Sequence, residues 1–302
     1  MIDSYKRSIE YARISLLSNC NLQCKYCFSE EFKSTRLATG DVYKILRGLK
    51  KLNFKKVRFT GGEPLMHPDI IEILEYAVLN FRDVGITTNG TLLDKYLDKL
   101  KVLGLKRINI SIDSLNKDEF KNLTKYDEFD NLLENILLAK KMGFIVKLNI
   151  VLIKELQNNF IKFIKFGKEN DIQVRFIELM KIGNNKTFVN DNYISSKDIL
   201  NDLDVEKLEK KKSDVCDYYL FDGYEFGIIS PISNHFCDRC NRIRITSNYK
   251  LRLCLHAKND FDFKDYLDEF DKFVLEKIEQ KQEKHLLNED ESIDKQMVEI
   301  GG

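Results

Sequence analysis

The feature that most limits the fold of this chain is an alternation of short apolar stretches, rich in β-branched residues, with stretches of helical periodicity. The predicted strands span residues 12–17, 57–60, 84–88, 107–112, 144–150 and 173–178. Between the fourth and fifth of these strands, residues 129–142 repeat apolar side chains at helical spacing, which predicts an amphipathic helix. Strands that alternate with helices form parallel sheets, so six such units predict a partial barrel or a doubly wound sheet.

A polar motif stands at or just beyond the carboxyl end of each predicted strand. The first is a cysteine triad, and the others are TGGEP at 60–64, TTNG at 87–90, SID at 111–113, KLN at 147–149 and ELM at 178–180. In α/β barrels the active site lies at this edge of the strands. The pattern therefore favours an α/β fold built as a partial (β/α)6 barrel of the TIM type, closed by the C-terminal region.

Six of the seven cysteines fall into two triads with different spacing. They are Cys20, Cys24 and Cys27, spaced C-x3-C-x2-C, and Cys237, Cys240 and Cys254, spaced C-x2-C-x13-C. A [4Fe–4S] cluster usually takes four thiolates, so three leave one iron open to a small molecule. Two open irons in one chain predict a redox enzyme with an auxiliary iron–sulfur region.

Zinc and disulfides are the alternatives for these cysteines. Structural zinc prefers four closed ligands, and only the second triad has candidates for the fourth, His235 and His256. Disulfides need an oxidising compartment, whereas the N-terminal sequence lacks the apolar core of a signal peptide. No run of about 18 apolar residues could cross a membrane. We expect a cytoplasmic chain with reduced thiols, Cys216 packed as an ordinary thiol, and His67 and His285 on the surface or on helices.

The charge of the chain is almost balanced. Lys and Arg number 49 and Asp and Glu 48 among 302 residues, which gives a net charge of +1. This balance argues against a general binder of nucleic acid or of membrane surfaces. An anionic ligand then needs a local group of cations, and the planar guanidinium matches phosphate oxygens. The arginines nearest the predicted site are Arg13, Arg58, Arg242 and Arg244.

The first triad, with Tyr26 before its last cysteine, resembles the signature of radical S-adenosylmethionine enzymes. The order of further segments is similar to that in the GTP 3′,8-cyclase family, which opens molybdenum-cofactor biosynthesis. These segments are VRFTGGEPLMHPDI, ITTNGTLL, RINISIDSL, VKLNIVLI, VRFIELMKIG, FCDRCNRIRIT, LRLCLH and MVEIGG. The resemblance covers nearly the whole chain, and its departures are CFSEEF in the first cysteine loop and IELMKIG after the sixth strand.

The resemblance implies a role for each matching residue. The first triad would hold a [4Fe–4S] cluster whose open iron binds S-adenosylmethionine, and the second triad would hold a second [4Fe–4S] cluster facing the guanine. The implied cofactor contacts are Tyr26, Gly62, Glu63, Ser111 and Met180. The implied GTP contacts are Arg13, Arg58, Thr87, Lys147, Arg242 and Arg244. The terminal Gly301 and Gly302 would reach into the active site as the catalytic tail.

The resemblance also implies a reaction, partners and a domain division. A 5′-deoxyadenosyl radical would convert GTP to 3′,8-cyclo-7,8-dihydro-GTP. The implied partners are a flavodoxin- or ferredoxin-type electron donor, the next enzyme, cyclic pyranopterin monophosphate synthase, and a second copy in a homodimer, with no nucleic acid and no membrane. We expect a barrel domain over 1–225 and a C-terminal region over 226–302, with the junction within 181–226.

Three alternatives remain open on the sequence. The nearest is a different radical S-adenosylmethionine enzyme with an auxiliary cluster, such as one that matures peptides. The second is an iron–sulfur protein that transfers electrons without catalysis. The third is a zinc-containing nucleotide-binding module.

Overall fold

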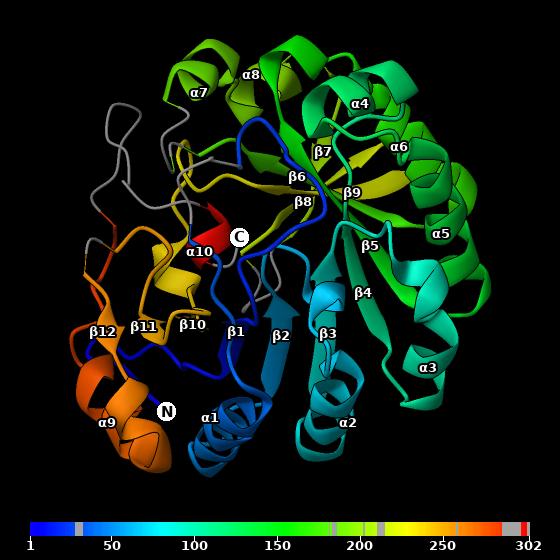
Figure 1. Cartoon of the computed structure of the whole chain (residues 1–302). Coiled ribbons are helices and arrows are strands. Elements are labelled where there is room, and N and C mark those ends of the chain that lie inside the picture. The colour runs from blue at the N-terminus through cyan, green and yellow to red at the C-terminus, as the bar shows by residue number, and fades with distance from the viewer. Residues whose placement is uncertain are drawn as a thin grey trace.

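The computed structural model describes residues 1–27, 33–180, 182, 186–201, 203–209, 215–257, 259–285 and 297–300. In this part of the chain, eight neighbouring strands run parallel and form a curved wall (Figure 1). In spatial order they are β10 (Arg242–Ile245), β1 (Tyr11–Ser15), β2 (Lys56–Thr60), β3 (Asp83–Thr88), β4 (Arg107–Ser111), β5 (Ile145–Leu152), β6 (Gln173–Glu178) and β9 (Tyr224–Ile229).

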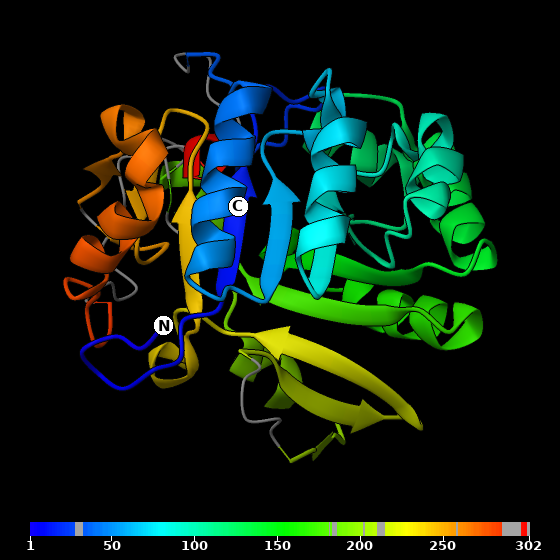
Figure 2. The same cartoon turned by 90° about the horizontal axis from the view of Figure 1, so that it is seen from below.

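Antiparallel strands extend both edges of this wall. On one side lie β11 (Lys250–Arg252) and β12 (Phe261–Asp262), and on the other lie β8 (Asp217–Phe221) and β7 (Glu206–Lys207). The described sheet therefore starts at β12 and ends at β7 without closing into a ring, which makes it a partial barrel (Figure 2). The α/β fold class and the six predicted strands are confirmed.

Crossover helices connect the parallel strands and cover the outer side of the sheet (Figure 1). They are α1 (Thr39–Lys51), α2 (Ile70–Asn80), α3 (Leu97–Val102), α4 (Lys117–Thr124), α5 (Phe129–Lys141) and α6 (Asn159–Asn170). Helix α5 fits the predicted helix over 129–142, with Leu132 and Ile136 fully buried. It ends one residue earlier, and Gly143 follows with φ of 83°, a left-handed conformation that commonly terminates helices.

Shorter helices complete the described chain. The α-helices are α7 (Lys186–Asn192), α8 (Ser196–Asn201), α9 (Phe270–Ile278) and α10 (Met297–Ile300). The 3-10 helices are η1 (Pro64–Met66), η2 (Leu93–Lys95), η3 (Lys154–Leu156), η4 (Cys237–Arg239) and η5 (Lys264–Glu269). Among the described residues, none of these helices combines the length and the apolar run that crossing a bilayer requires.

The C-terminal region joins the barrel through strand pairing. β10 adds to β1 in parallel, with Tyr11 opposite Arg242 and Arg13 opposite Arg244. The buried Arg7 guanidinium also donates to the carbonyl oxygens of Cys237, at 2.8 Å, and Glu283, at 2.7 Å. The expected boundary after residue 225 falls inside β9, within one continuous sheet, and the two-domain division stays a prediction.

Candidate active site

The loop that carries the first cysteine triad leaves β1 and is held against the GGEP motif. The amides of Gly62 and Glu63 donate to the carbonyls of Leu17, at 2.7 Å, and Asn19, at 2.8 Å. A Cβ atom at Gly62 would lie 2.1 Å from the Asn19 oxygen, so only glycine permits this approach. Gly62 therefore brings its own backbone against the cysteine loop.

The cysteines of the first triad are partly buried, and their thiols interact electrostatically. Burial raises the pKa of Cys20 to about 11 and that of Cys24 well above its ordinary value. The neighbouring Cys27 and Cys20 raise the pKa of Cys24 further. Coordination to a metal is the interaction that deprotonates such thiols, so this donor set fits an iron–sulfur cluster.

Glu63 is fully buried and joins the ends of β2 and β3. Its carboxylate accepts hydrogen bonds from Leu65 N, at 2.9 Å, Thr88 Oγ1, at 2.8 Å, and Asn89 N, at 2.7 Å. Burial raises its pKa to about 7. Asn89 Nδ2 in turn lies 3.6 Å from Cys20 Sγ. Glu63 thus supports the cysteine loop through Asn89, and its expected contact with S-adenosylmethionine stays a prediction.

Tyr26 fixes the other side of the cysteine loop to β4. Its hydroxyl donates to Asp113 Oδ2 at 2.6 Å, and Asp113 Oδ1 accepts from Val151 N at 2.7 Å. Burial raises the pKa of Asp113 to about 6. Asp113 was not among the predicted site residues, although it lies in the SID motif beside the predicted Ser111. Ser111 ends β4 opposite Asn149 of β5.

Met180 connects the predicted cofactor site to the second cysteine triad. Its sulfur lies 3.3 Å from Nε2 of His256, two residues after Cys254. Met180 also packs against a small apolar cluster that contains Ile182 and the buried Ile300 of α10. Gly301 and Gly302 lie outside the described residues, directly after Ile300. Figure 1 shows α10 near the middle of the molecule, beside β10.

The second triad lies where the N-terminal segment, β10 and the C-terminal segment meet. Cys237 begins η4, Cys240 directly follows the last residue of η4, and Cys254 follows β11. Although burial opposes ionisation of Cys240, Lys281 and Arg242 lower its pKa below the ordinary value. The buried Lys281 is held in place because its Nζ donates to the carbonyls of Arg242 and Leu253. This cationic setting fits a thiolate ligand.

The predicted locations of His67 and His285 are wrong. His67 and His285 are 1% and 5% exposed, not surface residues. His67 Nε2 contacts the Leu37 carbonyl at 3.0 Å, and the ring of His285 lies between those of His235 and His256. His285 therefore belongs to the surroundings of the second triad, together with His235 and His256, the two candidates for a fourth zinc ligand.

Strand register gathers the predicted arginines inside the barrel. Arg58, Arg13 and Arg244 lie side by side on β2, β1 and β10, and Gly85 of β3 continues the row. Two residues nearer the start of each strand, a second row contains Lys56, Tyr11 and Arg242. Residues two apart share a face of a strand, and neighbouring strands are about 4.8 Å apart. The rows therefore place at least five cations on one face.

Five side chains of these two rows border a polar cavity of about 130 Å³ inside the barrel, namely Tyr11, Arg13, Lys56, Arg58 and Arg242. Of the predicted GTP contacts, Arg13, Arg58, Lys147 and Arg242 line it, whereas Thr87 and Arg244 do not. Thr87 Oγ1 instead accepts a hydrogen bond, at 3.3 Å, from Asn109, which does line it. The lining residues that were not predicted include Tyr11, Lys56, Arg107, Asn109, Asn149 and Arg175. Strand alternation could have identified Lys56, which lies two residues before Arg58.

Polar atoms in this cavity lack partners within the described chain. The buried Nε and Nη1 of Arg58 and the Nε of Arg242 make no hydrogen bond there. Burial, together with nearby Arg242, Arg58 and Arg175, lowers the pKa of Arg13 to about 10. Buried cations that crowd one another are stabilised by an anion. The cavity therefore has the electrostatics of a phosphate site.

Tyr11 has an unusual acidity because it lies among these cations. Burial by itself would raise the pKa of its phenol, but four cations outweigh this effect and lower it to about 7. They are Arg13, Arg58, Arg242 and Lys56. Since the pKa is depressed in the folded chain, the stabilisation is complete above pH ~10 and is lost as the pH falls through about 7.

We expect one of the tyrosines to ionise near neutral pH. The phenolate absorption of the cluster-free protein should show a transition at about pH 7 that the Tyr11→Phe variant lacks. GTP should move this transition upward, because its phosphates compete with the phenolate for the same cations. Tyr224→Phe is the matched control, since burial raises the pKa of Tyr224 to about 12. A transition that persists in Tyr11→Phe would contradict this assignment.

Comparisons with known proteins agree with this site. The sequence model of the Radical SAM superfamily matches residues 14–167, and that of Molybdenum Cofactor Synthesis C matches residues 172–287. The SuiB structure from Streptococcus suis bound to S-adenosylmethionine aligns with a TM-score of 0.64 over 86% of this chain and 65% of that chain. At 17% identity this similarity concerns the fold alone. The partial barrel and the first triad define a radical S-adenosylmethionine enzyme.

Relatives of similar sequence show which family within this superfamily the chain belongs to. The GTP 3′,8-cyclases of Alkaliphilus oremlandii and Clostridium botulinum (strain Langeland) are 38% and 36% identical along the full length of both chains. The molybdenum cofactor biosynthesis protein moc-5 of Caenorhabditis elegans is 38% identical over 87% of this chain and 46% of its own length. The chain belongs to the GTP 3′,8-cyclase family.

Proposed function

We propose that this chain converts GTP to 3′,8-cyclo-7,8-dihydro-GTP in the first step of molybdenum-cofactor biosynthesis. The arginine rows of β1, β2 and β10 are the observation that carries this proposal. The guanidinium groups of Arg13, Arg58 and Arg242 line a cavity, and among the described residues Arg58 and Arg242 have donor atoms without a hydrogen-bond partner. β1 leads into the first triad, and β10 begins two residues after Cys240, so a nucleotide held by these rows would lie between both triads.

The two triads fit two [4Fe–4S] clusters, each with three protein thiolates. When bound, the first cluster with S-adenosylmethionine would supply the 5′-deoxyadenosyl radical that takes the 3′ hydrogen of GTP before that carbon joins C8. Tyr26, through Asp113, and Glu63, through Asn89, fix the loop that carries the first triad. Ser111 and Met180 would complete the cofactor contacts, with Gly62 setting the loop position.

The remaining side chains would hold the substrate. Arg13, Arg58 and Arg242 would neutralise the triphosphate, and their fixed rows would keep the ribose and guanine oriented, which is a proximity effect worth up to ~7–11 kcal/mol. Thr87, Lys147 and Arg244 would make further contacts with GTP. The match of Gly301 and Gly302 to the family's tail supports their proposed catalytic role.

The direct test is anaerobic reconstitution followed by incubation with GTP, S-adenosylmethionine and dithionite. The expected product is an isomer of GTP that chromatography separates from the substrate, while S-adenosylmethionine is cleaved to methionine and 5′-deoxyadenosine. A reaction that needs a peptide instead of GTP would favour the peptide-maturation alternative. Absence of S-adenosylmethionine cleavage by the iron-loaded, reduced protein would favour electron transfer without catalysis.

Deleting Gly301 and Gly302 is expected to reduce cyclised product strongly, while the iron content and the fold stay unchanged. The tail follows the buried Ile300, so the deletion removes no residue of the described core. The amount of cyclised product, separated from GTP by chromatography, and the iron per chain measure the two effects. Normal turnover without the two glycines would show that the tail has no catalytic role.

Partners and location are proposed on the same basis. A flavodoxin- or ferredoxin-type protein would deliver the electron, and cyclic pyranopterin monophosphate synthase would take the product. The seven cysteines, all within the described residues, form no disulfide bonds, which is typical of proteins in a reducing cytoplasm. Family similarity supports a homodimer, which sedimentation of the cluster-loaded chain would test.

A further inference from the structure

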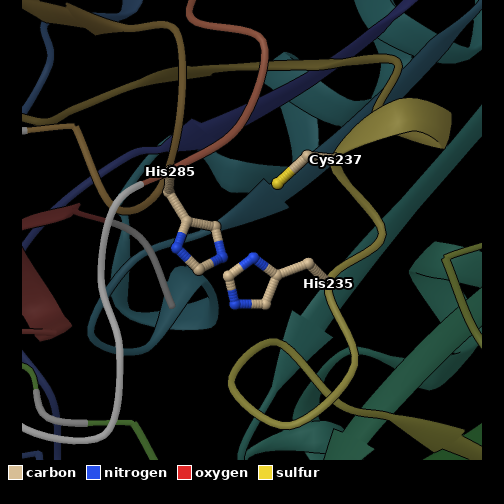
Figure 3. Close-up of side chains that lie close together, drawn as sticks. All are labelled: His235, Cys237 and His285. Atoms are coloured by element: carbon tan, nitrogen blue, oxygen red, sulfur yellow. The ribbon is translucent and has the colours of Figure 1, made fainter.

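Three side chains beside the second cysteine triad form a compact set of metal donors. They are His235, Cys237 and His285, and their ligand atoms all lie within 4.8 Å of one another (Figure 3). Around one tetrahedral zinc ion, nitrogen and sulfur donors lie roughly 3.3–3.6 Å apart, as the Zn–N and Zn–S bond lengths require. Small side-chain rotations would therefore suffice to place all three around a single ion.

The orientation of His285 supports coordination. Its Nε2 lies 3.1 Å from the Pro231 carbonyl, and because a carbonyl only accepts, Nε2 carries the proton. Metal-bound histidines almost always donate their second ring N–H to such an acceptor, which fixes the tautomer and aims the other nitrogen at the ion. Figure 3 shows the rings of His285 and His235 facing each other, with the Cys237 sulfur directed toward them.

Arg7 holds the two segments of the set at a fixed separation. The Nη1 atom of Arg7 donates to the carbonyl of Cys237, at 2.8 Å, and to that of Glu283, at 2.7 Å. Glu283 lies two residues before His285. Asp3 accepts from Arg7 Nε at 2.6 Å, in a pair that is almost completely buried. The donors are thus preorganised by a buried guanidinium that lies outside the set.

The donor chemistry selects the class of ion. Two imidazole nitrogens and one thiolate suit zinc and similar transition ions, whereas magnesium and calcium require oxygen ligands. We propose that the cluster-free chain binds one zinc ion at His235, Cys237 and His285, with water at the fourth position. Because Cys237 also belongs to the second triad, this ion and the second cluster are alternative occupants of one region.

The test uses the full-length, reduced, cluster-free chain in anaerobic buffer. Cobalt is titrated first, since a thiolate ligand gives it a charge-transfer absorption, and zinc is then added in competition with a chromogenic chelator. His235→Phe and His285→Phe keep the ring volume but remove the nitrogens. Each should weaken zinc binding by more than the about 10- to 100-fold that loss of an outer-shell partner produces.

His256→Phe is the matched control, because its ring centroid lies 4.2 Å from that of His285, in a tilted arrangement, but the residue lies outside the donor set. Its zinc affinity should equal that of the unmodified chain. If it falls as far as in His285→Phe, packing of the rings and not coordination explains the effect. If only Cys240→Ala or Cys254→Ala abolishes binding, the ion sits on the cysteine triad and the proposed set is wrong.

A second measurement tests mutual exclusion without using activity. Zinc-loaded chain, reconstituted with iron and sulfide, should take up about four fewer irons than zinc-free chain, the content of one cluster. Removing zinc with a chelator should restore the difference. Full iron uptake with zinc still bound would overturn the shared-region assignment.

Discussion

Replacing Cys24 by alanine is expected to abolish the formation of 5′-deoxyadenosine from S-adenosylmethionine. Cys24 is one of three partly buried cysteines in the loop after β1 whose thiols interact electrostatically. A cluster left with two protein thiolates loses an anchor, so the iron content should also fall by about four atoms per chain. Anaerobic product analysis and iron counting on the same preparation measure both losses.

Cys216→Ala is the matched control for Cys24→Ala. Cys216 is 1% exposed and lies outside both triads, with its sulfur 3.7 Å from the Asp217 carbonyl. Its replacement removes a buried thiol without touching a predicted ligand. Deoxyadenosine formation that survives in Cys24→Ala would refute the first cluster, and its loss in Cys216→Ala would point to damage to the fold.

Gly85→Ala is expected to weaken GTP binding by about 10- to 150-fold, the equivalent of the ~1.5–3 kcal/mol of a hydrogen bond to a charged group. A Cβ atom at this position would lie 1.5 Å from Arg58 Nη1 and 2.7 Å from the Arg107 carbonyl. The added methyl group must displace the guanidinium from the row. Equilibrium binding of GTP to the cluster-loaded protein measures the change.

Two comparisons make the Gly85 result specific. At Gly40 in α1, an added Cβ meets nothing within 4 Å, so Gly40→Ala should leave GTP affinity unchanged. If Gly85 acts through Arg58, the double variant Gly85→Ala with Arg58→Ala should bind GTP no worse than Arg58→Ala alone. Additive losses would mean that the clash with the Arg107 backbone, and not Arg58, explains the effect.

Much of the barrel is visible in the sequence because its signals are local. Apolar runs of β-branched residues mark β1 to β6, and the helical spacing of Leu132 and Ile136 marks α5. The expected strand limits differ from the structure by at most two residues. The flanking parallel strands β9 and β10 were not among the six predicted strands, although β9 is as long as β3 and β6.

The residues that line the cavity were predicted only in part from the sequence. Arg13, Arg58 and Arg242 were chosen from their motifs, and the cavity contains all three. Lys56 and Tyr11 belong to the same cavity but lie outside every family segment, and Arg175 lies inside the segment VRFIELMKIG without having been chosen. Their inward direction depends on the face that each strand presents, and a shift of one residue in register would reverse it.

The sequence by itself determined the ligand types, the strand–helix order and the family, because cysteine spacing and periodicity are properties of neighbouring residues. Only the tertiary structure decided that Arg13 lies between Arg58 and Arg244, and that His285 meets Cys237 and His235. These contacts join residues that lie from 45 to more than 200 positions apart along the chain. Such contacts arise from strand pairing and from the buried Arg7 bonds, which act across the folded molecule and leave no periodic trace in the local sequence.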